Sequence, residues 1–157
     1  MQSECNMKKK TLIIIAIVVA LVVCAAIFFR PVSLLNGGSV IESGTVLYVR
    51  YSDDLKQDEF ESFDTAGYEQ ELTDYFKTVK VRRTLSSKYG NGQYMRLNMM
   101  LTCSGNQKGV NIMLWHDGSH ASINGKYYDL LDPEKVFYDL LDILGIEDDF
   151  PFETITY

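Results

Sequence analysis

The chain opens with one long apolar run, and shorter segments with helix or strand periodicity follow it. Eighteen consecutive apolar residues, 12–29, contain no charged side chain. As a helix rising about 1.5 Å per residue, this run spans roughly 27 Å, close to the thickness of the hydrocarbon core of a bilayer. Because the run has no polar face, we predict a transmembrane helix over 12–29 rather than a core helix of a globular domain.

The charges that flank the run predict its orientation. Three lysines at 8–10 precede it, and Arg30 is the basic residue that follows it. By the positive-inside rule, the N-terminal segment 1–11 lies in the cytoplasm and the rest of the chain lies outside. The expected localisation is therefore the cell membrane, single-pass, with an extracellular C-terminal domain.

Cys24 leaves the fate of this helix open. The tetrapeptide 21–24 resembles the lipobox of bacterial lipoproteins, but Val23 stands where that motif has a small residue, and the apolar run continues past Cys24. The small residues that follow also suit an ordinary signal peptidase. We expect an uncleaved signal anchor, with lipidation of Cys24 and release by cleavage as the alternatives.

Segment 30–39 follows the apolar run and contains the small polar sequence Asn-Gly-Gly-Ser. We predict a flexible linker there, at most about 30 Å long, which keeps the next domain close to the membrane. The extracytoplasmic domain is expected over 40–157. It begins with a strand predicted at 40–51, where β-forming residues alternate. The acidic stretch 52–64 indicates a solvated loop or a short helical turn.

Two segments show the spacing of an amphipathic helix. Apolar side chains recur every three to four residues over 68–79 and again over 133–144. Asp132 is a candidate N-cap for the second helix, and Pro133 suits its first position. Gly145 is a typical C-terminal stop.

The remaining segments predict an antiparallel meander, because apolar and polar residues alternate and turn sequences such as Asp-Gly and Asn-Gly separate them. The predicted strands are 80–88, 93–103, 110–116, 119–123 and 126–130. The order of elements therefore predicts an α+β fold: an N-terminal transmembrane helix, then an antiparallel β-meander sheet with two helices packed on one face.

The charge balance restricts the partners. The part of the chain after Arg30 holds 20 acidic and 11 basic residues. Such a domain repels phosphate backbones, which argues against nucleic acid as a partner. The same repulsion predicts that the domain stands off anionic lipid head groups.

The polar face of the predicted sheet is the candidate binding surface. Aromatic side chains mixed with Arg and Asn are typical of recognition surfaces. The alternative is that another element covers this face or that it is only solvated. The candidate ligand-binding residues are Tyr94, Arg96, Asn98, Asn111, Met113 and Trp115.

The sequence offers no catalytic constellation. It has neither a Gly-x-Ser-x-Gly motif nor a phosphate-binding glycine loop. His116 and His120 flank a predicted hairpin turn, where they point to opposite faces or lie diagonally apart, a poor geometry for one metal ion. Cys103 is expected to be a small buried hydrophobic residue. We therefore assign no catalytic residue, no metal ligand and no cofactor.

The order of elements after the apolar run, with Ile-Asn-Gly-Lys-Tyr-Tyr at 123–128, resembles small membrane-anchored or lipoprotein-like exported domains of unknown function from Gram-positive bacteria. That resemblance implies export and supplies no catalytic residue. Our leading hypothesis is a non-enzymatic binding, sensing or accessory domain, tethered through 12–29, for an unknown protein or cell-envelope ligand. The alternatives are a small cell-envelope hydrolase with an unrecognised site and an immunity-type protective membrane protein.

Overall fold

The computed structural model describes residues 2–51, 57–84, 95–115 and 118–147. The chain forms two compact units that meet between Arg30 and Pro31. The first unit contains helix α1, Gln2–Phe28. Its segment Thr11–Phe28 is long and apolar enough to cross a membrane, and no part of it is buried inside the chain. The predicted apolar helix is thus confirmed as a helix, with the length and composition of a membrane span or a signal sequence.

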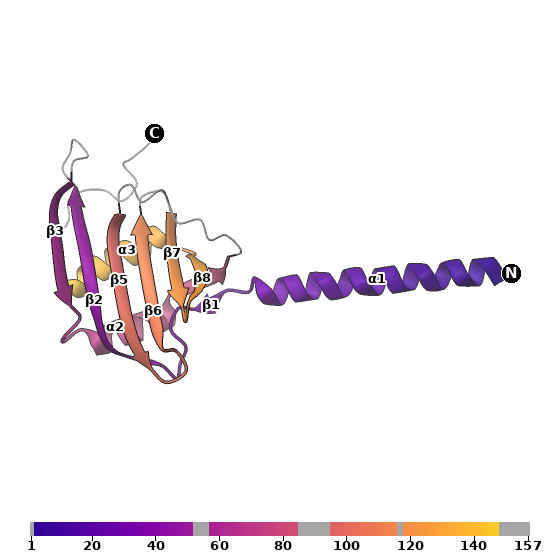
Figure 1. Cartoon of the computed structure of the whole chain (residues 1–157), viewed down its shortest axis with the longest axis horizontal. Coiled ribbons are helices and arrows are strands. Elements are labelled where there is room, and N and C mark those ends of the chain that lie inside the picture. Colours follow the sequence, from indigo (N-terminus) through magenta and orange to yellow (C-terminus); the bar gives the residue numbers. More distant parts are fainter. Residues whose placement is uncertain (1, 52–56, 85–94, 116–117, 148–157) are drawn as a thin grey trace. The chain divides into compact units, whose positions relative to one another are not determined.

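The second unit is an α+β domain built on one antiparallel sheet, as predicted (Figure 1). Its elements in chain order are β1 Val32–Ser33, β2 Val40–Tyr51, β3 Gln57–Asp64, α2 Glu69–Thr78, β4 Lys80–Arg83, β5 Met95–Ser104, β6 Gly109–Trp115, β7 Gly118–Ile123, β8 Lys126–Leu130 and α3 Pro133–Leu144. The eight strands lie in the order β1-β4-β8-β7-β6-β5-β2-β3.

The strands β5 to β8 form the predicted meander, but β4 does not belong to it. The sequence predicted a hairpin between 80–88 and 93–103, whereas β4 pairs with β1 and β8 and β5 pairs with β2 and β6. Strands that follow one another in the sequence usually pair. The local sequence therefore gives no sign that β4 and β5 lie apart in the sheet. The acidic stretch is also different from the prediction, because β3 occupies 57–64 and pairs with β2.

Turn chemistry explains the ends of several elements. Asn124 and Gly125 both have positive φ, 50° and 76°, and they join β7 to β8 as predicted. Gly145 ends α3 in the left-handed conformation, also as predicted. Asp132 is the N-cap residue of α3, as predicted, but its side chain makes no cap hydrogen bond. Gly118 pairs with Trp115 and belongs to β7, rather than to the turn predicted at Asp117-Gly118.

One hydrophobic core unites the sheet and the two helices. Alternate residues of the strands, such as Leu97, Met99 and Ile112, are fully buried in the same cluster as Phe76 of α2 and Phe137 of α3. Figure 1 draws both helices behind the sheet. Burying a large apolar side chain contributes about 1.5–3 kcal/mol, so this shared cluster is the main source of stability for the domain.

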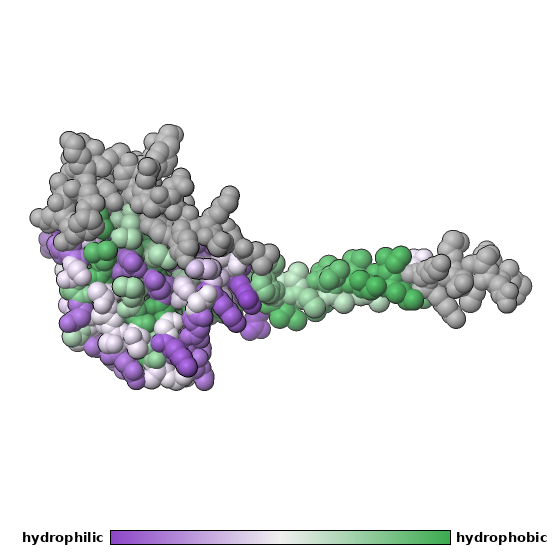
Figure 2. Space-filling view, viewed as in Figure 1, coloured by the Kyte–Doolittle hydropathy of each residue, from purple (hydrophilic) through white to green (hydrophobic). Residues whose placement is uncertain are grey.

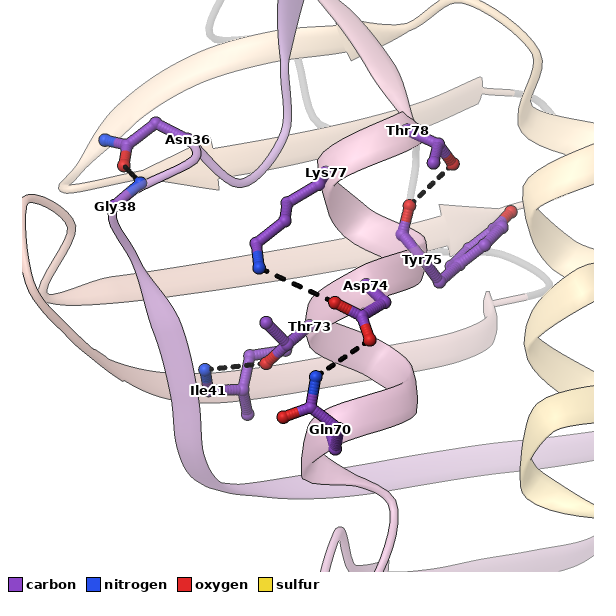
Figure 3. Close-up of polar contacts among 9 residues, drawn as sticks. All are labelled: Asn36, Gly38, Ile41, Gln70, Thr73, Asp74, Tyr75, Lys77 and Thr78. Carbon is purple, nitrogen blue, oxygen red and sulfur yellow. Dashed lines mark hydrogen bonds and ion pairs between the residues drawn. The ribbon is translucent and has the colours of Figure 1, made fainter.

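Residues 32–39 are docked on the domain rather than forming the predicted linker. The N–H groups of Leu34 and Leu35 donate to the carbonyls of Val79 and Phe76, and both leucine side chains are fully buried. Farther along, the Ile41 N–H donates to Thr73 Oγ1 of α2 at 3.0 Å (Figure 3). The burial of Leu34 and Leu35 holds this segment on the domain, although the flexible sequence Asn-Gly-Gly-Ser follows them.

Gln107, in the turn between β5 and β6, clamps this entry segment. Its Nε2 donates to the Leu34 carbonyl at 2.8 Å, and its Oε1 accepts from the Asn36 N–H at 2.6 Å. Its backbone N–H donates to Ser39 Oγ at 3.1 Å. The side chain of Gln107 is 4% exposed. Because residues 32–39 are held on the domain, only residues 29–31 are left between the end of α1 and the start of β1.

Candidate functional site

The candidate site is the open face of the sheet, opposite the core that contains α2 and α3. Residues that face each other across antiparallel strands share a face, so the register defines which side chains lie there. One row across the sheet consists of Leu47, Asn98, Met113, His120, Asp129 and Arg82. The next row consists of Thr45, Met100, Asn111, Ser122 and Tyr127. We call these two rows the open face.

The open face mixes apolar and polar side chains. Thr45, Met100 and Arg82 are exposed, and the other residues of the open face are partly buried. Figure 2 shows this mixture as green patches among white and purple residues on the side of the sheet turned to the viewer. Met100 is 55% exposed and lies between Thr45 and Asn111 in its row. An exposed methionine adapts its shape to a partner, which suits a binding surface.

Two side-chain oxygens on the open face are buried and have no hydrogen-bond partner. They are Oδ1 of Asn98 and Oδ1 of Asn111. The two residues are diagonal neighbours on adjacent strands, because Asn98 pairs with Met113 and Asn111 pairs with Met100. A buried acceptor without a donor costs free energy, so each side chain would gain from turning its oxygen outward toward an N–H or O–H group of a ligand.

A shallow hollow of about 280 Å³ lies beside the Asn111 amide. The open-face side chains that line it include Met100, Asn111 and Ser122. The hollow therefore places one unpaired amide oxygen next to exposed apolar surface. That combination suits a ligand that offers both apolar contact and hydrogen-bond donors.

The structure brings together three of the six residues predicted from sequence. Asn98, Asn111 and Met113 lie on the open face. Tyr94 lies outside the described residues. For Trp115 the structure gives only the backbone, which pairs with Met95 and Gly118 at the end of β6.

Arg96 does not lie on the face where the alternation placed it. The pairing slips between Met95 and Leu97, so Arg96 is an extra residue in a β-bulge. Its side chain is fully buried, and its guanidinium carbon lies 4.8 Å from the ring centroid of Phe137 on α3. Arg96 is thus a core residue held by a cation–π contact rather than part of the open face.

Sequence reasoning missed the pair formed by His120 and Asp129. His120 Nδ1 lies 2.9 Å from Asp129 Oδ1, and both side chains are partly buried on the open face. Within the described ranges, no three His, Cys, Asp or Glu side chains are placed to hold one metal ion. His120 and Asp129 are nine residues apart in the sequence, and that spacing does not predict a contact. The two side chains meet only because of the register between β7 and β8.

A second concavity, of about 400 Å³, lies between α2, β4 and α3. Its polar groups include Tyr75, Lys135 and Asp139. Burial, followed by a hydrogen bond to Asp139, raises the pKa of the Tyr75 hydroxyl. Partial burial acts to raise the pKa of Asp139, but hydrogen bonds from Lys135 and Tyr75 outweigh it and hold that pKa below its usual value. This is the shift of an ion-paired carboxylate, not of a proton donor poised for hydrolysis.

Comparison with protein-family models, with curated proteins and with solved structures finds no match to this chain.

Proposed function

We propose that the chain is a membrane-tethered binding domain that works outside the cell membrane and does no chemistry itself. The observation that carries the proposal is that an apolar helix, uncovered by any described part of the chain, is joined to a folded α+β domain. An uncovered helix of this kind is costly in water. In a bilayer its Leu, Ile, Val and Phe residues each contribute about −0.3 to −0.6 kcal/mol to insertion.

The lysines at 8–10 support an orientation with the N-terminus in the cytoplasm. In that orientation, the domain from Pro31 onward meets ligands of the cell envelope. Cys24 is exposed on α1 and carries no disulfide. Lipidation of Cys24 would leave the domain tethered to the same side of the membrane.

The ligand surface in this proposal is the open face. The side-chain oxygens of Asn98 and Asn111 lack hydrogen-bond donors, and Met100 offers exposed apolar surface for contact with a ligand. A peptide or a protein surface supplies both, through backbone N–H groups and side chains. No charged cluster or metal site is needed for such recognition.

Site-specific photo-crosslinking in cells of the source organism tests this proposal. A photoreactive amino acid at Met100 should yield a discrete crosslinked species, and Asn111→Ala should reduce its yield by at least about threefold, the loss expected for one hydrogen bond. The same photoreactive residue at Glu71, exposed on α2, is the matched control. Equal crosslinking at the two positions, or none at Met100, would refute the open face as the binding surface.

A further inference from the structure

The connection between helix and domain is too short to let the domain leave the membrane surface. This inference rests on the proposed function, namely that α1 spans the membrane. Four Cα–Cα steps lead from Phe28, the last residue of α1, to Val32, the first residue of β1. Fully extended, they reach at most about 14 Å. The polar headgroup layer on each side of a bilayer is roughly 5–8 Å thick. Chain length alone therefore keeps β1 in or just above the headgroups.

The strand next to β1 is basic. β4 has the sequence Lys-Val-Arg-Arg, with three basic residues and no acidic one. Lys80 and Arg82 are exposed, and Lys80 Nζ donates to Ser33 Oγ of β1 at 2.9 Å. Beyond Val32, β1 leaves the edge of β4 uncovered, because Pro31 has no N–H to continue the ladder. Arg82 and Arg83 thus follow Val81, the partner of the first residue of β1.

The opposite edge of the sheet has the opposite charge. β3 contains four acidic residues and no basic one. Seven strand spacings of about 4.8 Å place it roughly 34 Å from β1. Charged side chains on an edge strand also prevent unwanted strand pairing. Acidic side chains serve that purpose equally well, as on β3, so it does not explain why all the charged residues of β4 are basic.

Apolar side chains flank the basic strand. Val32 is 36% exposed and Leu131 is 42% exposed, and the Leu131 N–H donates to the Lys80 carbonyl. Basic groups beside exposed apolar groups are the composition of surfaces that bind at the membrane interface. One carboxylate, that of Asp129, lies opposite Arg82 in the register and is hydrogen-bonded to His120.

We propose that the β1–β4 edge, defined by Val32, Lys80, Arg82 and Arg83, docks on the anionic headgroups of the membrane that holds α1. The domain then lies with its basic edge on the lipid and its acidic edge pointing away. The expectation that the acidic domain stands off the bilayer treated its charge as uniform. With the charges segregated by edge, a net negative domain still binds an anionic surface through one side.

Amine acylation of the full chain in nanodiscs tests the docking. One set of nanodiscs contains phosphatidylcholine alone, and the other contains about one third phosphatidylglycerol. We expect acylation of Lys80 to be about fivefold slower in the anionic nanodiscs. The matched control is the amine introduced by Glu61→Lys, exposed on the far edge strand β3, which should react at the same rate in both.

A second variant tests the cause. Arg82→Gln with Arg83→Gln should bring the acylation of Lys80 in anionic nanodiscs close to its rate in phosphatidylcholine. Equal rates for Lys80 in both lipids, or equal slowing of the two amines, would overturn the docking while the anchor proposal stands. A chain that does not co-purify with nanodiscs of either kind would instead overturn the anchor proposal itself.

Discussion

At the scale of single residues, Gln107 decides how the domain is attached. Its two side-chain hydrogen bonds reach the Leu34 carbonyl and the Asn36 N–H, which have a sequence separation of about 70 residues from it. Gln107→Ala leaves both backbone groups buried without their partner, and each costs about 1–3 kcal/mol. We expect the free energy of unfolding of the full chain in detergent to fall by about 2–4 kcal/mol.

Hydrogen exchange locates that loss. Amides of 34–39 should exchange faster in the Gln107→Ala protein than in the wild type, while amides of α3 keep their protection relative to global stability. Gln107→Glu keeps the acceptor for Asn36 but buries a carboxylate against the Leu34 carbonyl, so it should raise exchange in 34–39 at least as much. Unchanged exchange in 34–39 would show that the entry segment is held by other contacts.

Asp139 gives a pH-dependent prediction at the same scale. Its pKa is lowered in the folded protein, so its ionised form stabilises the fold above the pKa of the unfolded state, about 3.9, and that contribution is lost as the pH falls through the folded pKa. Asp139→Asn should therefore cost about 1 kcal/mol at pH 7 and less near pH 3. Urea unfolding at both pH values measures this difference. An equal cost at both would contradict the ionic role.

At the scale of elements, the bulge in β5 ties the sheet to α3. Arg96→Ala removes a fully buried side chain and its contact with the Phe137 ring, which should cost about 2–4 kcal/mol. Met100→Ala, four residues along the same strand and exposed, should change stability by less than about 0.5 kcal/mol. Chemical denaturation of the two variants compares them, and equal effects would contradict the core placement of Arg96.

The same elements show what periodicity predicts and what it cannot. The spacing over 133–144 and the Asn124-Gly125 turn predicted α3 and the β7–β8 hairpin, because these features depend on local interactions. The predicted face of Arg96 was wrong, because one inserted residue in β5 reverses the alternation of side chains between the two faces of the sheet. The place of β4 was wrong because pairing between distant strands is decided by tertiary packing. Of the candidate site, Asn98, Asn111 and Met113 were predictable from alternation alone, whereas the His120–Asp129 pair required the register.

At the scale of the whole molecule, the proposed account joins an anchor, a short connection and a sheet with one open face. The open face is available for a ligand, and the basic edge sets how the domain lies on the lipid. Both roles depend on α1 remaining in the membrane with the domain outside. Without that arrangement, the basic strand β4 and the acidic strand β3 would have no membrane surface that could orient the domain.

Protease treatment of intact cells that carry a C-terminally tagged full chain tests this arrangement most directly. We predict that the tagged chain stays in the membrane fraction after alkaline extraction and that a protease added outside the cells removes the domain, leaving an N-terminal fragment of the size of α1 in the membrane. A tagged chain that is released by alkaline extraction, or that remains intact until the cells are lysed, would contradict the account.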